Sequence, residues 1–229
     1  MKLGIMQPYF LPYIGYWQLM NIVDKYVIYD DVNYIKAGYI SRNKLLLNGK
    51  EFMFNLILSG ASQNKLICEI IVADNQSKLI KTIERAYKKS PCFNNIFPII
   101  KSIIEFENKN LARFIGNSII QIASCLGLKT EFIYSSEIKK DCSLRGQEKI
   151  LNICNILLAT EYINAIGGME LYSKEIFKEQ KIELKFIKSK PIEYRQFNNE
   201  FVPLLSILDV MMFNSVEKIN KMLDNFEVI

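Results

Sequence analysis

The chain has 229 residues, of which 50% are apolar and 23% charged, and its 29 Lys and Arg against 24 Asp and Glu give a net charge of +5. This composition can build a sizeable hydrophobic core and excludes a disordered chain. The length is typical of one domain, so we expect a single α/β domain over residues 1–229. The sequence has no histidine, which excludes Ser-His-Asp and Cys-His catalysis and His-ligated zinc.

The positive charges are few and dispersed, so we expect no nucleic-acid partner. The five cysteines form no Cys-x-x-Cys pair, and their odd number and the lack of a secretory leader favour a reducing compartment. We therefore expect a cytoplasmic protein with structural thiols. No apolar stretch reaches the roughly 18 residues of a membrane helix, so we expect no membrane span.

The first half of the chain begins with a strand, a turn and a helix. A short apolar strand over 3–6 is followed by Gln7–Pro12, where the prolines cannot donate to a sheet. Pro12 suits the first position of a helix running to about Asn21. A second strand over 26–29 ends at Asp30-Asp31. Asn48-Gly49 joins strands over 40–47 and 52–58, which predicts a β-hairpin insertion within 40–72, or an antiparallel edge.

Helices then predominate before strands return. The periodicity predicts helices near 79–87, 96–106 and 111–126, the last with Asn108 as its cap and Gly127 as its end, so 76–127 is a helical elaboration. Strands follow over 130–134, 162–164 and 184–187, with a helix at 144–158 and two short helices near 206–213 and 215–226. This alternation predicts a Rossmann-like, mainly parallel sheet, with ligands outside the carboxyl ends of its strands.

That rule indicates three candidate sites. The first is the turn after the first strand, where a helix N-terminus can bind an anion, and its candidate ligand-binding residues are Gln7, Tyr9, Tyr13, Gly15 and Tyr16. An aromatic core is the alternative interpretation of these tyrosines.

The second candidate follows the second strand. Asp30 or Asp31 could act as a base, bind a ribose hydroxyl or hold a metal, and the residues expected to bind substrate nearby are Asn33, Lys36, Arg42 and Asn43. A solvated turn is the alternative.

The third candidate combines a polar helix start with a diglycine whose backbone N–H groups could face a ligand. Its residues are Arg145, Gln147, Asn164, Gly167, Gly168, Glu170 and Tyr172. A tight turn explains the diglycine equally well.

These segments carry a family resemblance. The runs 6–16, 29–36 with Arg42-Asn43, 62–65, 146–148, 162–164 with Gly167-Gly168 and 170–172, and 205–210 resemble, in this order, the WbqC-like family along nearly the whole chain. The resemblance adds Lys65, Ser206 and Asp209 to the candidate site residues. Ala37 departs from it, since family members usually have a basic residue there. Members are associated with bacterial O-antigen and other surface-polysaccharide clusters.

A second resemblance is more distant. The strand followed by Tyr13-Ile14-Gly15-Tyr16 is similar to the His-x-Gly-His signature of HIGH-type nucleotidylyl transferases, which have a Rossmann-like sheet. Tyrosines replace both histidines, and a neutral tyrosine cannot supply imidazolium charge. Nucleotidylyl transfer here would rely on the cations Lys36, Arg42, Lys65 or Arg145, with Mg²⁺ on Asp30 or Asp31 as an open alternative.

The resemblances and the residues together favour a transferase that attaches an acyl or aminoacyl group to a nucleotide-linked amino sugar. Asp30, Asp31 or Asp209 would deprotonate the amine, and the partners would be a nucleotide or nucleotide sugar and an acyl donor or carrier. A nucleotidylyl transferase and a non-catalytic sugar-nucleotide binding or scaffold protein remain alternatives. We expect the tyrosine-proline segment, the acidic step and the diglycine to meet at one rim of the sheet.

Overall fold

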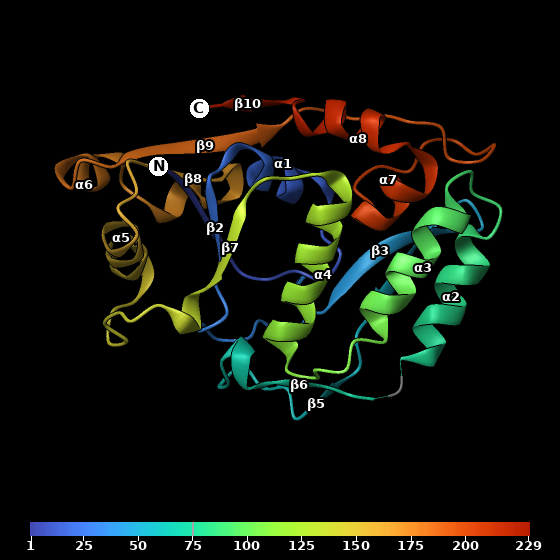
Figure 1. Cartoon of the computed structure of the whole chain (residues 1–229), viewed down its shortest axis with the longest axis horizontal. Coiled ribbons are helices and arrows are strands. Elements are labelled where there is room, and N and C mark those ends of the chain that lie inside the picture. Colours follow the sequence, from blue (N-terminus) through green and yellow to red (C-terminus); the bar gives the residue numbers. More distant parts are fainter. Residues whose placement is uncertain (75) are drawn as a thin grey trace.

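A computed structural model describes residues 1–74 and 76–229. Its centre is a six-stranded sheet in the order β10-β9-β8-β1-β2-β7 (Figure 1). All neighbours in this sheet pair in parallel except the edge strand β10. The strands span β1 Lys2–Met6, β2 Lys25–Ile28, β7 Glu131–Tyr134, β8 Glu161–Ala165, β9 Glu183–Ser189 and β10 Phe226–Val228. The expected Rossmann-like, mainly parallel sheet is therefore confirmed.

The sheet separates two hydrophobic cores because successive side chains of a strand point to opposite faces. In β2, Tyr26 and Ile28 belong to one core and Val27 to the other. Leu3 and Ile5 of β1 share the core of Val27. Both faces are thus covered by helices, which is the arrangement that parallel strands require.

Helices α5 and α6 supply the smaller core, and the remaining α-helices pack with the larger one (Figure 1). The helices on the larger core are α1 Ile14–Ile22, α2 Ser77–Tyr87, α3 Phe93–Ile104, α4 Leu111–Leu126, α7 Ile207–Phe213 and α8 Val216–Leu223. The other two are α5 Gly146–Ile156 and α6 Lys174–Glu179, and three 3₁₀ segments span Ile67–Glu69, Ser135–Glu137 and Ile166–Leu171.

The predicted hairpin forms a separate two-stranded sheet of β3 Arg42–Leu47 and β4 Lys50–Asn55. Asn48 and Gly49 both have positive φ, 53° and 74°, as a tight hairpin turn of the primed type requires. A second small sheet pairs β5 Leu58–Ser59 with β6 Ile71–Val72. These strands fall within 40–72 and helices α2–α4 within 76–127. That these two segments are an insertion and an elaboration stays a prediction.

Three local predictions differ from the structure. The cap of α4 is Asn110, whose side chain accepts from Arg113 N at 3.2 Å, whereas Asn108 Oδ1 accepts from Asn110 N. Helix α1 begins at Ile14 rather than Pro12, since Tyr13 is its N-cap. The last predicted helix ends at Leu223, and the chain then forms β10 because the open edge of β9 provides backbone partners.

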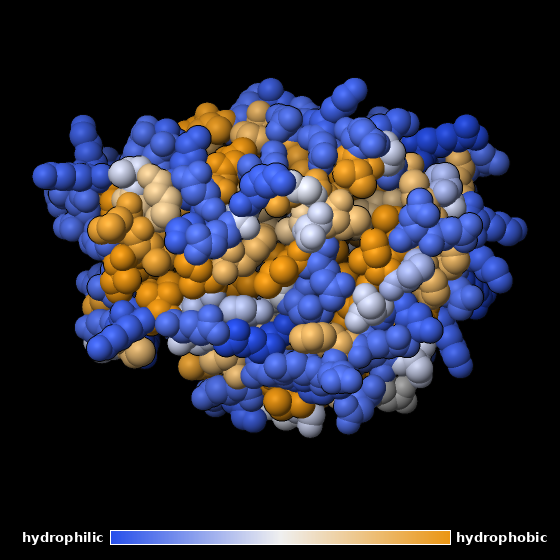
Figure 2. All heavy atoms as spheres, viewed as in Figure 1, coloured by the Kyte–Doolittle hydropathy of each residue, from blue (hydrophilic) through white to orange (hydrophobic). Residues whose placement is uncertain are grey.

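Apolar side chains gather on the face that Figure 2 shows, between α5 and α4 and over β7. Within residues 1–74 and 76–229, none of the helices combines the length and the apolar character needed to cross a bilayer.

Candidate functional site

A crevice of about 360 Å³ opens where three strands end. Met6 closes β1, Ala165 closes β8 and Ser189 closes β9, and all three line the crevice. The chain leaves β1 to one side toward β2 and later returns on the other side as β8, so the strand order reverses at this point. Ligands of open α/β sheets bind at such a reversal. The full lining is Met6, Tyr9, Pro12, Tyr13, Gly15, Tyr16, Tyr39, Asn43, Ala165, Ile166, Ile187, Ser189 and Leu204.

The loop between β1 and α1 forms one wall, and a strained residue sits in it. Leu11 is fully buried with φ of +47°, a left-handed conformation that a leucine rarely adopts. Its carbonyl accepts from Asn43 Nδ2 at 2.8 Å and from Ser206 Oγ at 2.7 Å. Two side chains distant in the sequence thus hold the conformation that Leu11 would otherwise leave.

Two aromatic residues of α1 fix the same loop from the other side. Tyr16 donates its hydroxyl to the Gln7 carbonyl at 2.8 Å, and Trp17 Nε1 donates to the Pro12 carbonyl at 3.1 Å. Trp17 is fully buried, whereas Tyr9 and Tyr13 are only partly buried and line the crevice. The aromatic-core interpretation therefore holds for Trp17, whereas ligand binding by Tyr9 and Tyr13 stays a prediction that their position in the crevice allows.

Substitution of Asn43 tests how this loop is held. Asn43→Ala removes the donor to Leu11 O, which is buried, and the acceptor of Lys44 N, which is partly buried. We expect the free energy of unfolding to fall by about 1–3 kcal/mol, the usual cost of stranding buried polar groups. Urea titration measures it. Asn55→Ala, at an exposed position of the partner strand, is the matched control, and equal effects of the two variants would contradict the role given to Asn43.

The crevice presents neutral hydrogen-bond donors. Burial raises the pKa of Tyr9, and it raises the pKa of Tyr13 although the neighbouring Ser189 hydroxyl partly opposes this. Both phenols are therefore protonated at neutral pH. Among the described residues that line the crevice, none carries a carboxylate or an ammonium group. The site can thus stack and hydrogen-bond a ligand, but its walls contain no ready base.

Helix α1 begins at this crevice, which Gly15 lines in its first turn. No described side chain caps the helix, so its first N–H groups are free of such a partner. A helix N-terminus carries a partial positive charge and favours an anionic group. The geometry therefore suits a ligand with an anionic part and a part that stacks on tyrosine.

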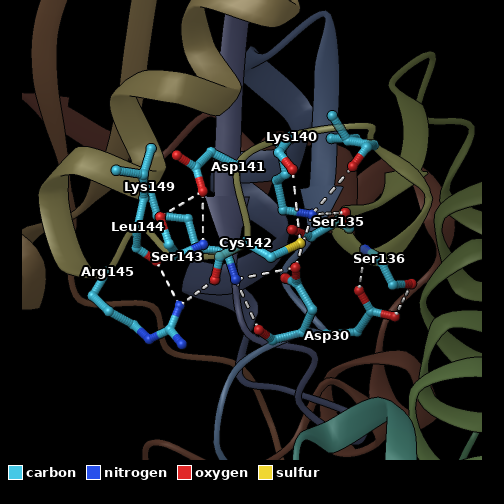
Figure 3. A network of polar contacts seen from close by, with 12 residues as sticks. Asp30, Ser135, Ser136, Lys140, Asp141, Cys142, Ser143, Leu144, Arg145 and Lys149 are labelled. Atoms are coloured by element: carbon cyan, nitrogen blue, oxygen red, sulfur yellow. Dashed lines mark hydrogen bonds and ion pairs between the residues drawn. The ribbon is translucent and has the colours of Figure 1, made fainter.

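The acidic step lies at the end of the neighbouring strand β2, and neither of its residues lines the crevice. Asp31 Oδ2 is 2.8 Å from Lys140 Nζ and 3.0 Å from Lys149 Nζ, with the lysine side chains only 2% and 5% exposed. Lys149 also donates to the Asp31 carbonyl at 2.8 Å. Two nearly buried ammonium groups thus share one carboxylate, in the network drawn around Lys140 and Lys149 in Figure 3.

Asp30 is held differently. Both of its oxygens accept from Ser136, from the backbone N–H at 2.9 Å and from the hydroxyl at 2.7 Å (Figure 3). Burial raises the pKa of Asp30 despite these hydrogen bonds. Burial acts in the same direction on Asp31, but the ammonium groups of Lys140 and Lys149, together with the nearby Ser135 hydroxyl, outweigh it and hold the pKa of Asp31 below its usual value. The pKa values of these two adjacent carboxyl groups are therefore shifted in opposite directions.

The surroundings of Asp30 and Asp31 do not suit a bound Mg²⁺ ion, which the sequence allowed as an alternative. The oxygens of Asp30 are occupied by Ser136, and two ammonium groups beside Asp31 would repel a divalent cation. Within the described part of the chain, no group of three or more Cys, Asp or Glu is placed to hold a metal ion.

The other residues predicted around the acidic step lie in the loop and hairpin that follow it. Arg42 donates to the carbonyls of Gly38 and Ala37, and Asn33 Nδ2 donates to the Gln63 carbonyl at 2.7 Å, so both stabilise their own loops. Lys36 and Lys65 are exposed and do not line the crevice. Only Asn43 of this group reaches it.

The third predicted site is divided. Ile166 begins the 3₁₀ segment Ile166–Leu171 and lines the crevice, whereas Gly167 and Gly168 of the same segment do not line it. Gly168 packs closely on Asn164, since a Cβ at Gly168 would lie 3.0 Å from Asn164 Nδ2. The remaining members are exposed or contact other parts of the protein, and none lines the crevice: Arg145, Gln147, Glu170 and Tyr172.

Asp209 is fully buried in α7 and does not line the crevice. Its carboxylate accepts from Tyr87 Oη at 2.8 Å, Tyr194 Oη at 2.7 Å and Gln196 Nε2 at 2.7 Å. Burial raises its pKa. These contacts give Asp209 a structural environment, and the predicted catalytic role stays untested.

Several residues of the site carry no signal in the sequence. Ser189 and Leu204 line the crevice but lie outside every motif. Ser136 and Lys140 reach the aspartates from a segment that reads as a polar loop, and Lys149 reaches them from the predicted helix over 144–158. The end of the predicted strand over 184–187 is the single pointer to Ser189, because ligands bind beyond the carboxyl ends of strands.

Comparison with known proteins agrees with the motifs. The chain is 26% identical over 218 residues to "Uncharacterized protein Rv1507c" from Mycobacterium tuberculosis (strain ATCC 25618 / H37Rv), with 93% of each chain covered. No solved structure matches it. Residues 7–221 match the family description "WbqC-like protein family", and the chain therefore belongs to that family.

Proposed function

We propose that this protein is a transferase of bacterial surface-polysaccharide (O-antigen) biosynthesis, which attaches an acyl or aminoacyl group to a nucleotide-linked amino sugar. The observation that carries the proposal is the tyrosine-lined crevice at the strand reversal, with the start of α1 on its wall. The pathway itself is taken from the family resemblance.

The crevice has features that suit both halves of such a ligand. Tyr9 and Tyr13 offer partly exposed rings on which a base or a sugar can stack. The first turn of α1 can receive the diphosphate. Asn43 and the tyrosine hydroxyls can hydrogen-bond sugar hydroxyl groups.

The proposed reaction balances with a thioester as the acyl donor. The sugar amine attacks the carbonyl carbon, so that a C–N bond forms and the C–S bond breaks. The thiolate leaves with the electron pair of that bond and takes up the proton that the amine releases. A neutral phenol such as Tyr13 can donate a hydrogen bond to the carbonyl oxygen as negative charge develops on it.

Asp30, Asp31 and Asp209 stay the proposed acceptors of the amine proton, but none of them lines the crevice, and the proton can also leave with the thiolate. One observation favours a second candidate, a sugar-nucleotide binding protein without catalysis: the described lining of the crevice has no carboxylate. Nothing in the crevice favours nucleotidylyl transfer, since its tyrosines are neutral where that chemistry uses imidazolium.

Removal of one aromatic wall tests the binding part of the proposal. We expect Tyr9→Ala to weaken binding of UDP- or dTDP-linked amino sugars about 5-fold to 150-fold in calorimetry, because base–aromatic stacking contributes about 1–3 kcal/mol. Phe52→Ala, at an exposed aromatic residue of β4, is the control and should bind like the unchanged protein.

Activity assays on the unchanged protein and these variants distinguish the candidate functions. Incubation with an amino-sugar nucleotide and acyl thioesters should add the mass of the acyl group to the sugar nucleotide. Binding without a mass shift across a broad donor panel would favour the binding protein. Release of pyrophosphate from a nucleoside triphosphate would support nucleotidylyl transfer. Absence of binding to every sugar nucleotide would remove the proposal.

A further inference from the structure

A second pocket adjoins the crevice. It has a volume of about 570 Å³ and shares three lining residues with the crevice, namely Tyr13, Ser189 and Leu204. We call these three residues the waist. The other residues of this pocket come from the segment after β9, namely Lys190, Pro191, Ile192, Glu193, Phe201 and Pro203. The two pockets therefore form one divided hollow, with the waist between them.

Leu204 is an unusual residue for this position. It has φ of +58° and is 65% exposed, so an apolar side chain is held toward solvent in a conformation that leucines avoid. Its neighbours explain how the strain persists. Leu205 is buried, and Ser206 is fixed by its N–H to the Lys44 carbonyl at 2.9 Å and by its hydroxyl to the Leu11 carbonyl at 2.7 Å. Strained residues held by their surroundings concentrate at functional sites.

The waist also has polar atoms. Ser189 Oγ is shielded from solvent and lies beside the Tyr13 side chain, and among the described residues it has no partner at full hydrogen-bond geometry. Hydroxyl groups at this place can donate to a carbonyl oxygen. On the far side of the waist the pocket wall is mainly apolar, with Ile192, Phe201 and Pro203, while its charged residues Lys190 and Glu193 are exposed. Such a wall suits an apolar chain with a polar end at the waist.

We propose that the second pocket receives the apolar acyl group that is transferred, so that the new amide bond forms at the waist. This inference rests on the proposed function. The amine of the sugar reaches the waist from the crevice, and the thioester carbonyl reaches it from the second pocket. As the C–N bond forms and the C–S bond breaks, the thiolate carries away the electron pair and the proton. Leu204 contacts the acyl chain and sets which chains fit.

A series of product analogues tests this assignment by binding alone. The probes are UDP- and dTDP-linked amino sugars whose nitrogen carries no acyl group, or an acetyl, butanoyl or hexanoyl group. Burial of one methylene strengthens binding about fourfold at most. We therefore expect affinity in calorimetry to rise by tenfold or more from acetyl to hexanoyl.

Variants of Leu204 provide the specific readout. We expect Leu204→Ala and Leu204→Gly to reduce the gain from acetyl to hexanoyl by about threefold or more. The gain is measured as a ratio of affinities within each variant, because Leu204 also lines the crevice and its replacement changes the affinity for the free-amine probe as well. The glycine variant also accommodates the positive φ, so it guards against a loss of folding. Leu158→Ala is the matched control, because Leu158 is also exposed, at 81%, with φ of +57°, yet lines neither pocket.

The outcomes are distinguishable. Equal affinity for all acyl lengths, with the free-amine probe bound, would overturn the second pocket as the acyl site and leave the proposed function standing. An unchanged length dependence in both Leu204 variants would overturn the assignment of Leu204. Failure of every probe to bind would remove the proposed function and this inference together.

Discussion

Asp31→Asn is expected to lower the free energy of unfolding by about 3–5 kcal/mol, the usual loss when one partner of a buried ion pair is removed. The substitution leaves two ammonium groups, Lys140 and Lys149, close together in surroundings where their side chains are 2% and 5% exposed. An asparagine of the same size can accept a hydrogen bond but cannot neutralise them. Urea titration at pH 7 measures the loss.

An exposed ion pair provides the comparison. Glu131→Gln breaks the pair with Lys25, whose side chain is 30% exposed, and such surface pairs contribute at most about 1 kcal/mol. We expect the double variant Asp31→Asn/Lys140→Met to recover part of the stability, because it removes one of the stranded charges. A loss for Asp31→Asn no larger than that for Glu131→Gln would show that water or a rearranged loop neutralises the lysines.

The parts of the fold that the sequence predicted depend on local signals. Pro8 and Pro12 end the first strand, and Asn48-Gly49 specifies the hairpin because both residues tolerate positive φ. Gly127 ends α4 with φ of +76°, as a left-handed cap should. Such signals act within a few residues, so they are visible without the fold.

The parts that could not be predicted depend on contacts across the chain. Ser206 lies 195 residues from the Leu11 carbonyl that it holds, and Lys149 lies 118 residues from the Asp31 carbonyl. Strand β10 forms because the edge of β9 is open, which the apolar pattern near the C-terminus does not encode. The crevice itself combines the ends of three strands, so its waist residues Ser189 and Leu204 become evident only once the strand order is known.

Of the three segments that were expected to meet at one rim of the sheet, only two contribute to the crevice, again because contacts across the chain decide their positions. The tyrosine-proline segment and Ile166 line one crevice because β1 and β8 are neighbours. The acidic step follows β2, on the other side of β1, and its side chains turn toward Ser136, Lys140 and Lys149 instead. Successive side chains of an extended chain point to opposite sides, so the sequence allows either direction for each aspartate. Only the hydrogen-bond and ion-pair partners decide which direction each one takes.

Asp209→Ala is expected to cost on the order of 4 kcal/mol of unfolding free energy. The substitution removes the shared acceptor of Tyr87, Tyr194 and Gln196, and each buried unsatisfied group costs about 1–3 kcal/mol. Tyr87 and Gln196 are buried and Tyr194 is partly buried, while Gln196 keeps its bond to the Val202 carbonyl. Asp209→Asn keeps one acceptor oxygen, so we expect it to cost less than about 2 kcal/mol. A catalytic Asp209 would instead lose product formation in the asparagine variant while stability and sugar-nucleotide affinity were kept.

The pH dependence of these losses separates Asp209 from Asp31. Burial raises the pKa of Asp209, so the folded state holds its proton above the unfolded value of about 3.9, and the wild-type contribution falls as pH rises through this interval. The difference in unfolding free energy between wild type and Asp209→Asn should therefore narrow from pH 4 to pH 7.

For Asp31 the folded pKa is lowered, so its contribution to stability is complete above the unfolded pKa and is lost as pH falls through the folded pKa. The gap for Asp31→Asn should widen as pH rises from about 3 to 5, and parallel trends for the two variants would contradict the opposite environments that the structure gives these carboxyls.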